Sequence, residues 1–497
     1  MNKSYTLLPF RFGRFPGATV LVVNETGDFQ FLPTELFDQL ISYRLDHRSA
    51  EFLDLKGKHF VTDTEIEPVI ELLATKYRTR KAFLTNFTAL HIVVVTLRCN
   101  QKCNYCHASS QPQEAKRWDM NRETAINTTK MIMETPSPIV KIEFQGGEPL
   151  LNFDIVKLII KTAKEINIKK QKDLSFVVCT NLTLITEEVL KYLRNEKVLI
   201  STSLDGPQKI HDLHRRMRDG SSSYEKFVKN LELSRKILAP EEISSLVTIT
   251  RDSLGKMTEV VDEYIRQGFC SIFLRPINPY GYARLEHVQK LVDYPIEDFV
   301  DAYKKVLPYI IDLNLKGMRI EECFTSLLLT RILTPFSTGF VDLQSPSGAG
   351  ISGAVYDYNG DVYPADEGRM LAKMGDRTFF MGNVNRDPYA RVFNSNFLRD
   401  LISKSCLETL PGCHSCVFQA YCGSDPIRNY AIQGTMIGHR PTSGFCFMHK
   451  EIFKYLFEIL RQDSPDYMDV FWSWITKRPL ESIRMRPCAN LKASRIT

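Results

Sequence analysis

Apolar and polar residues alternate in short runs over the first part of the chain. Residues 19–23 and 29–32 have the composition of strands, and residues 24–28, Asn-Glu-Thr-Gly-Asp, have that of a hairpin turn. Pro33 opens a helical pattern that places Leu36, Phe37, Leu40 and Ile41 on one face, and a second helix is expected at 66–77. This pattern predicts a small α+β domain at residues 1–88.

From about residue 90 the pattern changes to short strands separated by helices. Six runs rich in β-branched residues lie at 91–97, 140–144, 174–179, 198–203, 245–250 and 271–274. Apolar residues recur between them at helical spacing, as in Tyr224, Phe227, Val228, Leu231 and Leu238. Alternating strands and helices predict parallel βαβ units and an α/β fold. We expect a partial (βα)6 barrel of the TIM type at 89–320, with its chemistry at the carboxyl ends of the strands.

Beyond residue 322 the predicted elements become shorter. Strands are expected at 354–358 and 361–363, followed by a cysteine-rich stretch at 406–446 and a helix at about 450–461. We therefore expect a cysteine-rich domain at 321–463 and a basic tail at 464–497.

Charge is concentrated in that tail. Residues 477–497 hold six basic side chains and one acidic side chain, which accounts for +5 of the net charge of +6. The rest of the chain is near neutral, which argues against a nucleic-acid partner. No apolar run reaches 18 residues and no signal peptide is evident at the start, so we expect a cytoplasmic protein with no membrane partner.

The chain has twelve cysteines, and in a reducing compartment clustered cysteines are typical of metal or catalytic sites. Seven fall into two sets: Cys99, Cys103 and Cys106, and then Cys413, Cys416, Cys422 and Cys446. The other five fit small buried hydrophobic side chains, namely Cys179, Cys270, Cys323, Cys406 and Cys488.

The first set follows the first predicted barrel strand with CxxxCxxC spacing. Three thiolates can hold three irons of a cubane cluster, which leaves the fourth iron open to a ligand. A zinc site with a remote fourth ligand such as His107 is the alternative. The motif, with Tyr105 before its last cysteine, resembles that of the radical S-adenosylmethionine (SAM) enzymes. The resemblance implies that the open iron of a [4Fe-4S] cluster binds SAM, which is cleaved reductively to a 5′-deoxyadenosyl radical.

Two further segments are similar to this family. Gly146, Gly147, Glu148 and Pro149 follow the second barrel strand and resemble the motif that holds the SAM ammonium group. Glycines there allow the backbone to approach a ligand closely. Ser203, Asp205 and Arg215 resemble a segment of the peptide- and protein-modifying branch that contacts the ribose and carboxylate of SAM. As a turn sequence alone, either segment needs no ligand.

The second cysteine set resembles the C-terminal SPASM extension of radical SAM maturases, which binds two auxiliary clusters. Three expected ligands of the inner cluster are replaced, by Ser347, Ala365 and Pro426. The resemblance therefore implies one auxiliary [4Fe-4S] cluster, held by Cys413, Cys416, Cys422 and Cys446, with Cys406 as an alternative fourth ligand. A structural zinc knuckle would use the same residues.

Asp366 stands where related maturases carry an aspartate that takes a proton from the substrate. A carboxylate in a closed pocket can act as a base, although Asp366 could equally cap a turn.

The start of the chain and the segment around Cys422 are most similar to the His-Xaa-Ser system radical SAM maturases. That resemblance implies oxidative modification of a ribosomally made precursor peptide, with His-Xaa-Ser repeats as a possible feature and flavodoxin or ferredoxin as electron donor. The N-terminal domain would dock the peptide by strand addition or simply cover the barrel. Two alternatives stay open: a sulfatase-type maturase that forms formylglycine on a protein, and a zinc-stabilised binding scaffold.

Overall fold

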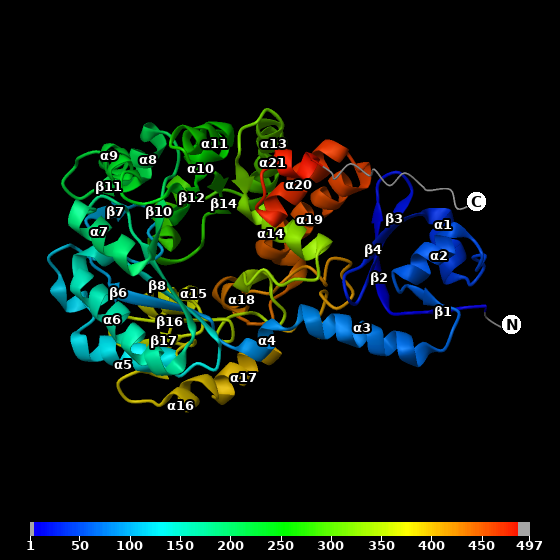
Figure 1. Cartoon of the computed structure of the whole chain (residues 1–497), viewed down its shortest axis with the longest axis horizontal. Helices are drawn as coiled ribbons and strands as arrows, with labels where there is room; N and C mark the ends of the chain where they lie inside the picture. Colours follow the sequence, from blue (N-terminus) through cyan, green and yellow to red (C-terminus); the bar gives the residue numbers. More distant parts are fainter. Residues whose placement is uncertain (1–3, 486–497) are drawn as a thin grey trace, which may run out of the picture.

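The computed structural model describes residues 4–485 (Figure 1). Its largest sheet has the strand order β14-β12-β10-β9-β8-β6-β16-β17-β18. The first six are mutually parallel and follow chain order from β6 outward: β6 (Leu90–Thr96), β8 (Ile139–Gly146), β9 (Asp173–Cys179), β10 (Val198–Ser203), β12 (Ile243–Ile249) and β14 (Leu274–Pro276). Sequential parallel neighbours confirm the predicted partial barrel.

One predicted barrel strand differs from the structure. The run 271–274 is divided: β13 (Ser271–Ile272) pairs with β15 (Glu321–Glu322), and only β14 pairs with β12. The sixth barrel strand is therefore short, and Arg275 lies within it.

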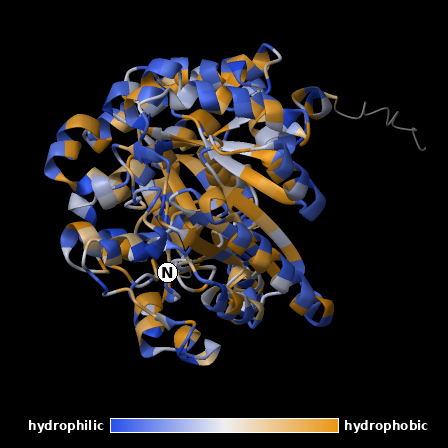
Figure 2. Cartoon of the chain, turned by 90° about the vertical axis from the view of Figure 1, so that its left-hand side faces the viewer, coloured by the Kyte–Doolittle hydropathy of each residue, from blue (hydrophilic) through white to orange (hydrophobic). Residues whose placement is uncertain are grey.

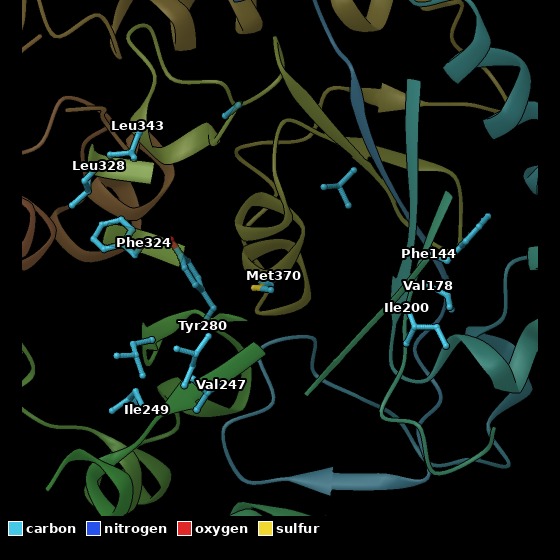
Figure 3. Packing of buried hydrophobic residues seen from close by; sticks show 14 of the residues in the cluster. Phe144, Val178, Ile200, Val247, Ile249, Tyr280, Phe324, Leu328, Leu343 and Met370 are labelled. Carbon is cyan, nitrogen blue, oxygen red and sulfur yellow. The ribbon is translucent and has the colours of Figure 1, made fainter. Parts of the chain in front are cut away.

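Helices pack along the outside of the parallel strands. They are α5 (Arg122–Met133), α6 (Phe153–Lys170), α7 (Glu187–Glu196), α9 (Ser223–Arg235), α11 (Met257–Arg266) and α13 (Ile296–Leu315). Phe144, Val178 and Ile200, from three neighbouring strands, lie together in the main core beneath these helices (Figure 3). Apolar strands are enclosed by helices with hydrophilic outer surfaces (Figure 2). In α9, Ser222 caps the first turn and Phe227 and Leu231 are buried, as the periodicity predicts.

The N-terminal domain has a sheet of β2 (Phe10–Phe15), β3 (Thr19–Asn24) and β4 (Phe29–Pro33), with helices α1 (Thr34–Ile41) and α2 (Ala50–Gly57). One face of the sheet forms a separate small core with these helices. The other face packs on the rest of the molecule, where the Phe29 ring lies 5.0 Å from that of Phe457. Helix α3 (Ile66–Arg80) then leads to α4 (Phe83–Asn86) and β6 (Figure 1).

The C-terminal region continues the barrel sheet. Strand β16 (Gly353–Tyr356) lies parallel to β6, and β17 (Asp361–Tyr363) and β18 (Gly382–Asn383) follow it antiparallel. The helices of this region include α15 (Asp366–Lys373), α18 (Pro426–Gln433) and α19 (Gly444–Gln462). Much of the expected tail is helical, in α20 (Pro465–Thr476) and α21 (Leu480–Arg484), because Val470, Phe471 and Trp474 bury an apolar face.

The scattered cysteines depart from the expectation of small buried side chains. Cys270 is exposed, and Cys179, Cys323 and Cys406 are half-buried, while Cys488 lies outside the described residues. Cys179 ends β9 with its side chain facing the inside of the barrel, which explains its access to solvent. All eleven described cysteines are free thiols. Between residues 4 and 485 no helix combines the length and apolar character needed to cross a membrane.

Candidate active site and auxiliary cysteine site

The first cysteine set lines a cavity of about 520 Å³ at the carboxyl ends of the barrel strands. The lining also contains several other predicted site residues: Tyr105, Gly146, Gly147, Ser203, Arg215 and Asp366. Glu148, Pro149 and Asp205 are not part of it. A second cavity, of about 610 Å³, lies between the N-terminal sheet and residues 332–335 and contains no predicted site residue.

The cysteine loop is held by a short antiparallel ladder. Strand β7 (Gln101–Cys103) pairs with β11 (Arg215–Met217), which sets Cys103 opposite Arg215. Backbone N–H groups of Gln101 and Ser110 point at the sulfurs of Cys99 and Cys106, each at 3.4 Å. Such donors stabilise negative charge on sulfur, so the loop is built to present thiolates to the cavity.

Without a bound cation the thiols of Cys99 and Cys103 hold their protons. Burial raises the pKa of Cys103 to about 12, and repulsion from Cys106 adds to the effect. Burial likewise raises the pKa of Cys99, with a contribution from Cys103. Within residues 4–485, no three Cys, His, Asp or Glu side chains are arranged to hold a single metal ion. Three thiols that line one cavity from a single loop fit an iron-sulfur cluster with one open iron, because a cluster needs thiolate ligands and would draw the protons from them.

A buried ion pair shapes the wall beside the cysteines. Arg215 Nε donates to Asp205 Oδ2 at 2.9 Å, and the Tyr105 hydroxyl donates to the same oxygen. Burial alone would raise the pKa of Asp205, but Arg215 and these hydrogen bonds hold it below its ordinary value. The guanidinium also lies 5.6 Å from the centre of the Tyr105 ring. Asp205 thus positions Arg215 and Tyr105, which face the cavity.

The glycine pair lies against the start of the cysteine loop. A Cβ on Gly146 would lie 1.9 Å from the Thr96 carbonyl oxygen, and one on Gly147 would lie 2.1 Å from that of Arg98. Gly146 also has a φ of +140°. Only glycine allows β8 to end so close to the cluster loop.

Glu148 is fully buried and binds protein groups. Its carboxylate accepts hydrogen bonds from Thr180 Oγ1 at 2.7 Å, Asn181 N at 2.8 Å and Leu150 N at 3.1 Å. Burial raises its pKa to about 7. Glu148 therefore orders the loop of Asn181, whose amide in turn approaches Cys99 Sγ at 3.8 Å.

Comparison with known proteins decides the identity of this site. Residues 93–263 match the radical SAM superfamily, and this segment includes the cysteine loop and the glycine pair. The chain therefore contains a radical SAM domain. This domain implies a [4Fe-4S] cluster and SAM as cofactors. The three thiols are suited to hold the cluster, and the cavity beside them has room for SAM.

Known relatives of this radical SAM enzyme include maturases. A cysteine-type anaerobic sulfatase-maturating enzyme from Clostridium perfringens is 25% identical over 370 residues, which cover 72% of this chain and 93% of the relative. The structure of native anSMEcpe with bound AdoMet and Cp18Cys peptide has a TM-score of 0.62 at 21% identity, over 77% of this chain and 99% of that one. The structure of SuiB from Streptococcus suis bound to precursor peptide SuiA has a TM-score of 0.52 at 14% identity, and the match covers 89% of this chain and 99% of that one. At these identities the structures establish the shared fold.

The second cysteine set of the enzyme lies apart from the cavity. Burial, together with repulsion from Cys416, Cys446 and Cys413, raises the pKa of Cys422, so the charges of these three thiols act on it at short range. Arg440 Nε approaches Cys413 Sγ at 3.0 Å. Cys406 instead donates to Glu408 Oε2 at 3.1 Å. The structure thus brings Cys446, rather than Cys406, to this set.

The three residues expected in place of inner-cluster ligands have different surroundings. The Ser347 amide donates to Ser405 Oγ at 3.1 Å, and Pro426 begins α18 after the capping residue Asp425. Ala365 lines the cavity just before α15. Asp366 Oδ1 accepts a hydrogen bond from Arg369 Nε at 2.7 Å.

Sequence reasoning missed several polar residues of the cavity. His107, Arg275, Asp342 and Glu367 all contribute to its lining. The motif offers His107 only as an alternative zinc ligand, and its buried Nε2 has no partner among the described residues. Arg275 at the end of the sixth strand was a detectable signal, since that end of a barrel carries the chemistry. Glu367 could have been noticed only as the neighbour of Asp366.

Proposed function

We propose that this radical SAM enzyme oxidatively modifies a ribosomally made peptide in the cytoplasm. The observation that carries the proposal is the continuous cavity, which runs from the three thiols to Phe340, Asp342 and the start of α15. A substrate chain at that far end would lie within the same enclosed space as the SAM site. The fold likeness to SuiB, extending over 89% of this chain, supports a peptide as the substrate class.

The chain's own residues have distinct roles in this proposal. The thiols of Cys99, Cys103 and Cys106 would hold the cluster, and Gly146, Gly147, Ser203 and Arg215 would contact SAM. When bound, these cofactors supply a 5′-deoxyadenosyl radical that abstracts a hydrogen atom. Asp205 and Glu148 act from behind the cavity wall by fixing Arg215 and the Asn181 loop. Walls fixed in this way exclude water from a reactive intermediate.

One auxiliary [4Fe-4S] cluster would be held by Cys413, Cys416, Cys422 and Cys446. The mutual electrostatic influence of the four thiols supports it, and it would serve electron transfer, with flavodoxin or ferredoxin as the external donor. Zinc at the same ligands is the alternative. Iron, sulfide and zinc analysis of anaerobically purified protein tests this, and one zinc per chain with a single cluster would favour the zinc knuckle.

The N-terminal domain would dock the precursor peptide. Strand β2 pairs with β3 and is an edge of its sheet within the described residues, and the Phe12 side chain on it is 50% exposed. A peptide strand could extend the sheet there. Replacing Gly13 in β2 by proline, which cannot join a ladder, should weaken peptide binding in a fluorescence anisotropy assay.

A sulfatase-type maturase is the second candidate. The relative from Clostridium perfringens, 25% identical over 72% of this chain, favours it. The serine, alanine and proline at 347, 365 and 426 speak against it, because the resemblance to such maturases implies cysteines there. A neighbouring short reading frame with His-Xaa-Ser repeats would favour the peptide, and a neighbouring sulfatase gene would favour formylglycine.

The decisive experiment incubates reduced enzyme, SAM and each candidate substrate. Mass spectrometry of the substrate and the yield of 5′-deoxyadenosine are the measurements. A peptide that loses two hydrogens in proportion to 5′-deoxyadenosine supports the proposal. Formylglycine on a sulfatase peptide, with the precursor peptide unchanged, would replace it with the second candidate.

A further inference from the structure

The first turn of α15 carries two adjacent acids with different surroundings. Asp366 accepts a hydrogen bond from Arg369, whose side chain is only 1% exposed, and the two form an ion pair. Glu367 forms no ion pair, and no hydrogen bond with another residue, anywhere in the part of the chain that the structure describes. Both side chains line the cavity shared with the cysteine loop. Asp366 is therefore committed to a buried cation, whereas Glu367 is free to exchange a proton.

Glu367 faces other acids from neighbouring elements. Burial raises its pKa to about 8, and repulsion from Asp342, Asp425 and Asp366 contributes. Asp342 lies in the short helix Val341–Leu343 before the cis Ser345-Pro346 bond, and its own pKa is raised to about 6 by burial and by Asp425. Asp342 and Glu367 thus line the cavity from two elements, and Asp425, which is not part of the lining, adds its charge from a third.

Two cations lie near this acidic group, and one of them, Arg428, is committed to other residues. Arg428, which attracts Glu367, donates to Asp425 Oδ2 at 3.3 Å and also to Asn278 Oδ1. Arg275 lines the cavity, and its charge offsets part of the rise in the pKa of Asp342. Neither cation forms an ion pair with Glu367 among the described residues.

An unpartnered hydroxyl also faces the acids. The Tyr280 side chain is 0% exposed, and its hydroxyl has no hydrogen-bond partner in the described part of the chain. The charges acting on it are those of Asp425, Arg428, Glu367 and Asp342. Tyr280 lies between the buried Phe324 and Val247, with Met370 of α15 nearby (Figure 3). A buried hydroxyl without a partner beside a carboxyl group indicates a proton site that changes occupancy or accepts a further ligand.

We propose that Glu367, rather than Asp366, is the residue that accepts a proton from the substrate. This rests on the proposed peptide oxidation. The 5′-deoxyadenosyl radical removes one hydrogen atom from a substrate C–H bond. A second substrate group, X–H, gives its proton to the Glu367 carboxylate as a C–X bond forms. The remaining electron passes to an iron-sulfur oxidant, so the product has two hydrogens fewer than the substrate.

The first test compares matched variants. Glu367→Gln should lower the peptide product formed per 5′-deoxyadenosine by about a hundredfold or more, as expected for loss of a general base. Asp366→Asn should lower it by a smaller factor, and the exposed Glu188→Gln serves as the control that keeps the wild-type ratio. In the wild type, the ratio should rise as pH rises through about 8. A wild-type ratio in Glu367→Gln, or a greater loss in Asp366→Asn, would overturn the assignment.

A second test requires no turnover. Difference infrared spectroscopy of the metal-free full chain should show a carboxylic acid band that disappears as pH rises through about 8. The band should be absent in Glu367→Gln and should titrate at lower pH in Asp342→Asn, which removes a repelling charge. Absence of the band in folded wild-type protein would refute the proton site. If the band is present but no tested peptide is modified, it is the proposed function that fails, and the proton-acceptor role fails with it.

Discussion

The two cysteine sets of this radical SAM enzyme occupy very different surroundings. Cys99, Cys103 and Cys106 open onto a cavity of about 520 Å³, and the nearest cation, Arg215, is neutralised by Asp205. Cys413 and its partners adjoin no part of that cavity, and Arg440 contacts the sulfur directly. A site that binds and releases a small molecule needs room beside an incomplete ligand set. A site that only stores or passes an electron needs a complete set and nearby positive charge.

Removing one ligand from each set gives the largest expected contrast. Cys103→Ala should abolish 5′-deoxyadenosine formation, because the SAM-binding cluster keeps only two protein ligands. Cys416→Ala should still permit some SAM cleavage, because its set lies outside the cavity. Chromatographic measurement of 5′-deoxyadenosine under dithionite checks both, and total loss in both variants would contradict separate roles.

The fourth ligand of the outer set is tested by a matched pair. Cys446→Ser should reduce iron from about eight to about four atoms per chain if both clusters are of the [4Fe-4S] type. Cys406→Ser should keep the wild-type iron, because that thiol is directed to Glu408. Iron analysis of anaerobically prepared protein is the measurement. The opposite pattern would assign the ligand to Cys406.

Loss of the buried ion pair in the cavity wall beside the first set should strongly reduce the free energy of unfolding. Arg215→Met leaves the fully buried Asp205 carboxylate without its cation, and loss of one partner of a buried pair costs about 3–5 kcal/mol. The double variant Asp205→Asn with Arg215→Met should recover part of that loss. Urea unfolding of the metal-free protein measures both. If Arg215→Met lowers the free energy of unfolding by less than about 1 kcal/mol, the pair contributes no more than a surface ion pair does.

The ligands expected in the first set are neighbours in the chain, so a local motif was enough to name them. The six-strand barrel was also predictable, since its strands are short runs rich in β-branched residues that are separated by helices. The division of 271–274 was not, because it depends on pairing of β13 with the distant β15. The helix α20 was hidden by the basic composition around it, although Phe471 and Trp474 bury its apolar face.

Residues that act across the fold were harder to assign. Ser203 and Asp205 are two positions apart, yet Ser203 lines the cavity and Asp205 lies behind it. The environment of Glu367 depends on Asp342 and Asp425, from two other segments. No local pattern in the sequence reports such a juxtaposition, and the different neighbours of Cys446 and Cys406 likewise appear only in the folded chain.

The smallest predicted effect concerns Glu148, behind the first set. Its pKa is raised by burial from 4.5 to about 7, so the native state holds this proton more tightly than the unfolded chain. Its contribution to stability is therefore fully present below about pH 4.5 and is lost as pH rises to about 7, by about 3 kcal/mol. Glu148→Gln resembles the protonated side chain and should remove this loss, whereas the exposed Glu188→Gln should not. Urea unfolding of the metal-free protein at a series of pH values measures the difference between each variant and the wild type. If Glu148→Gln and wild type show the same pH dependence, the carboxylate is already ionised in the native state, and the three donors from Thr180, Asn181 and Leu150 outweigh its burial.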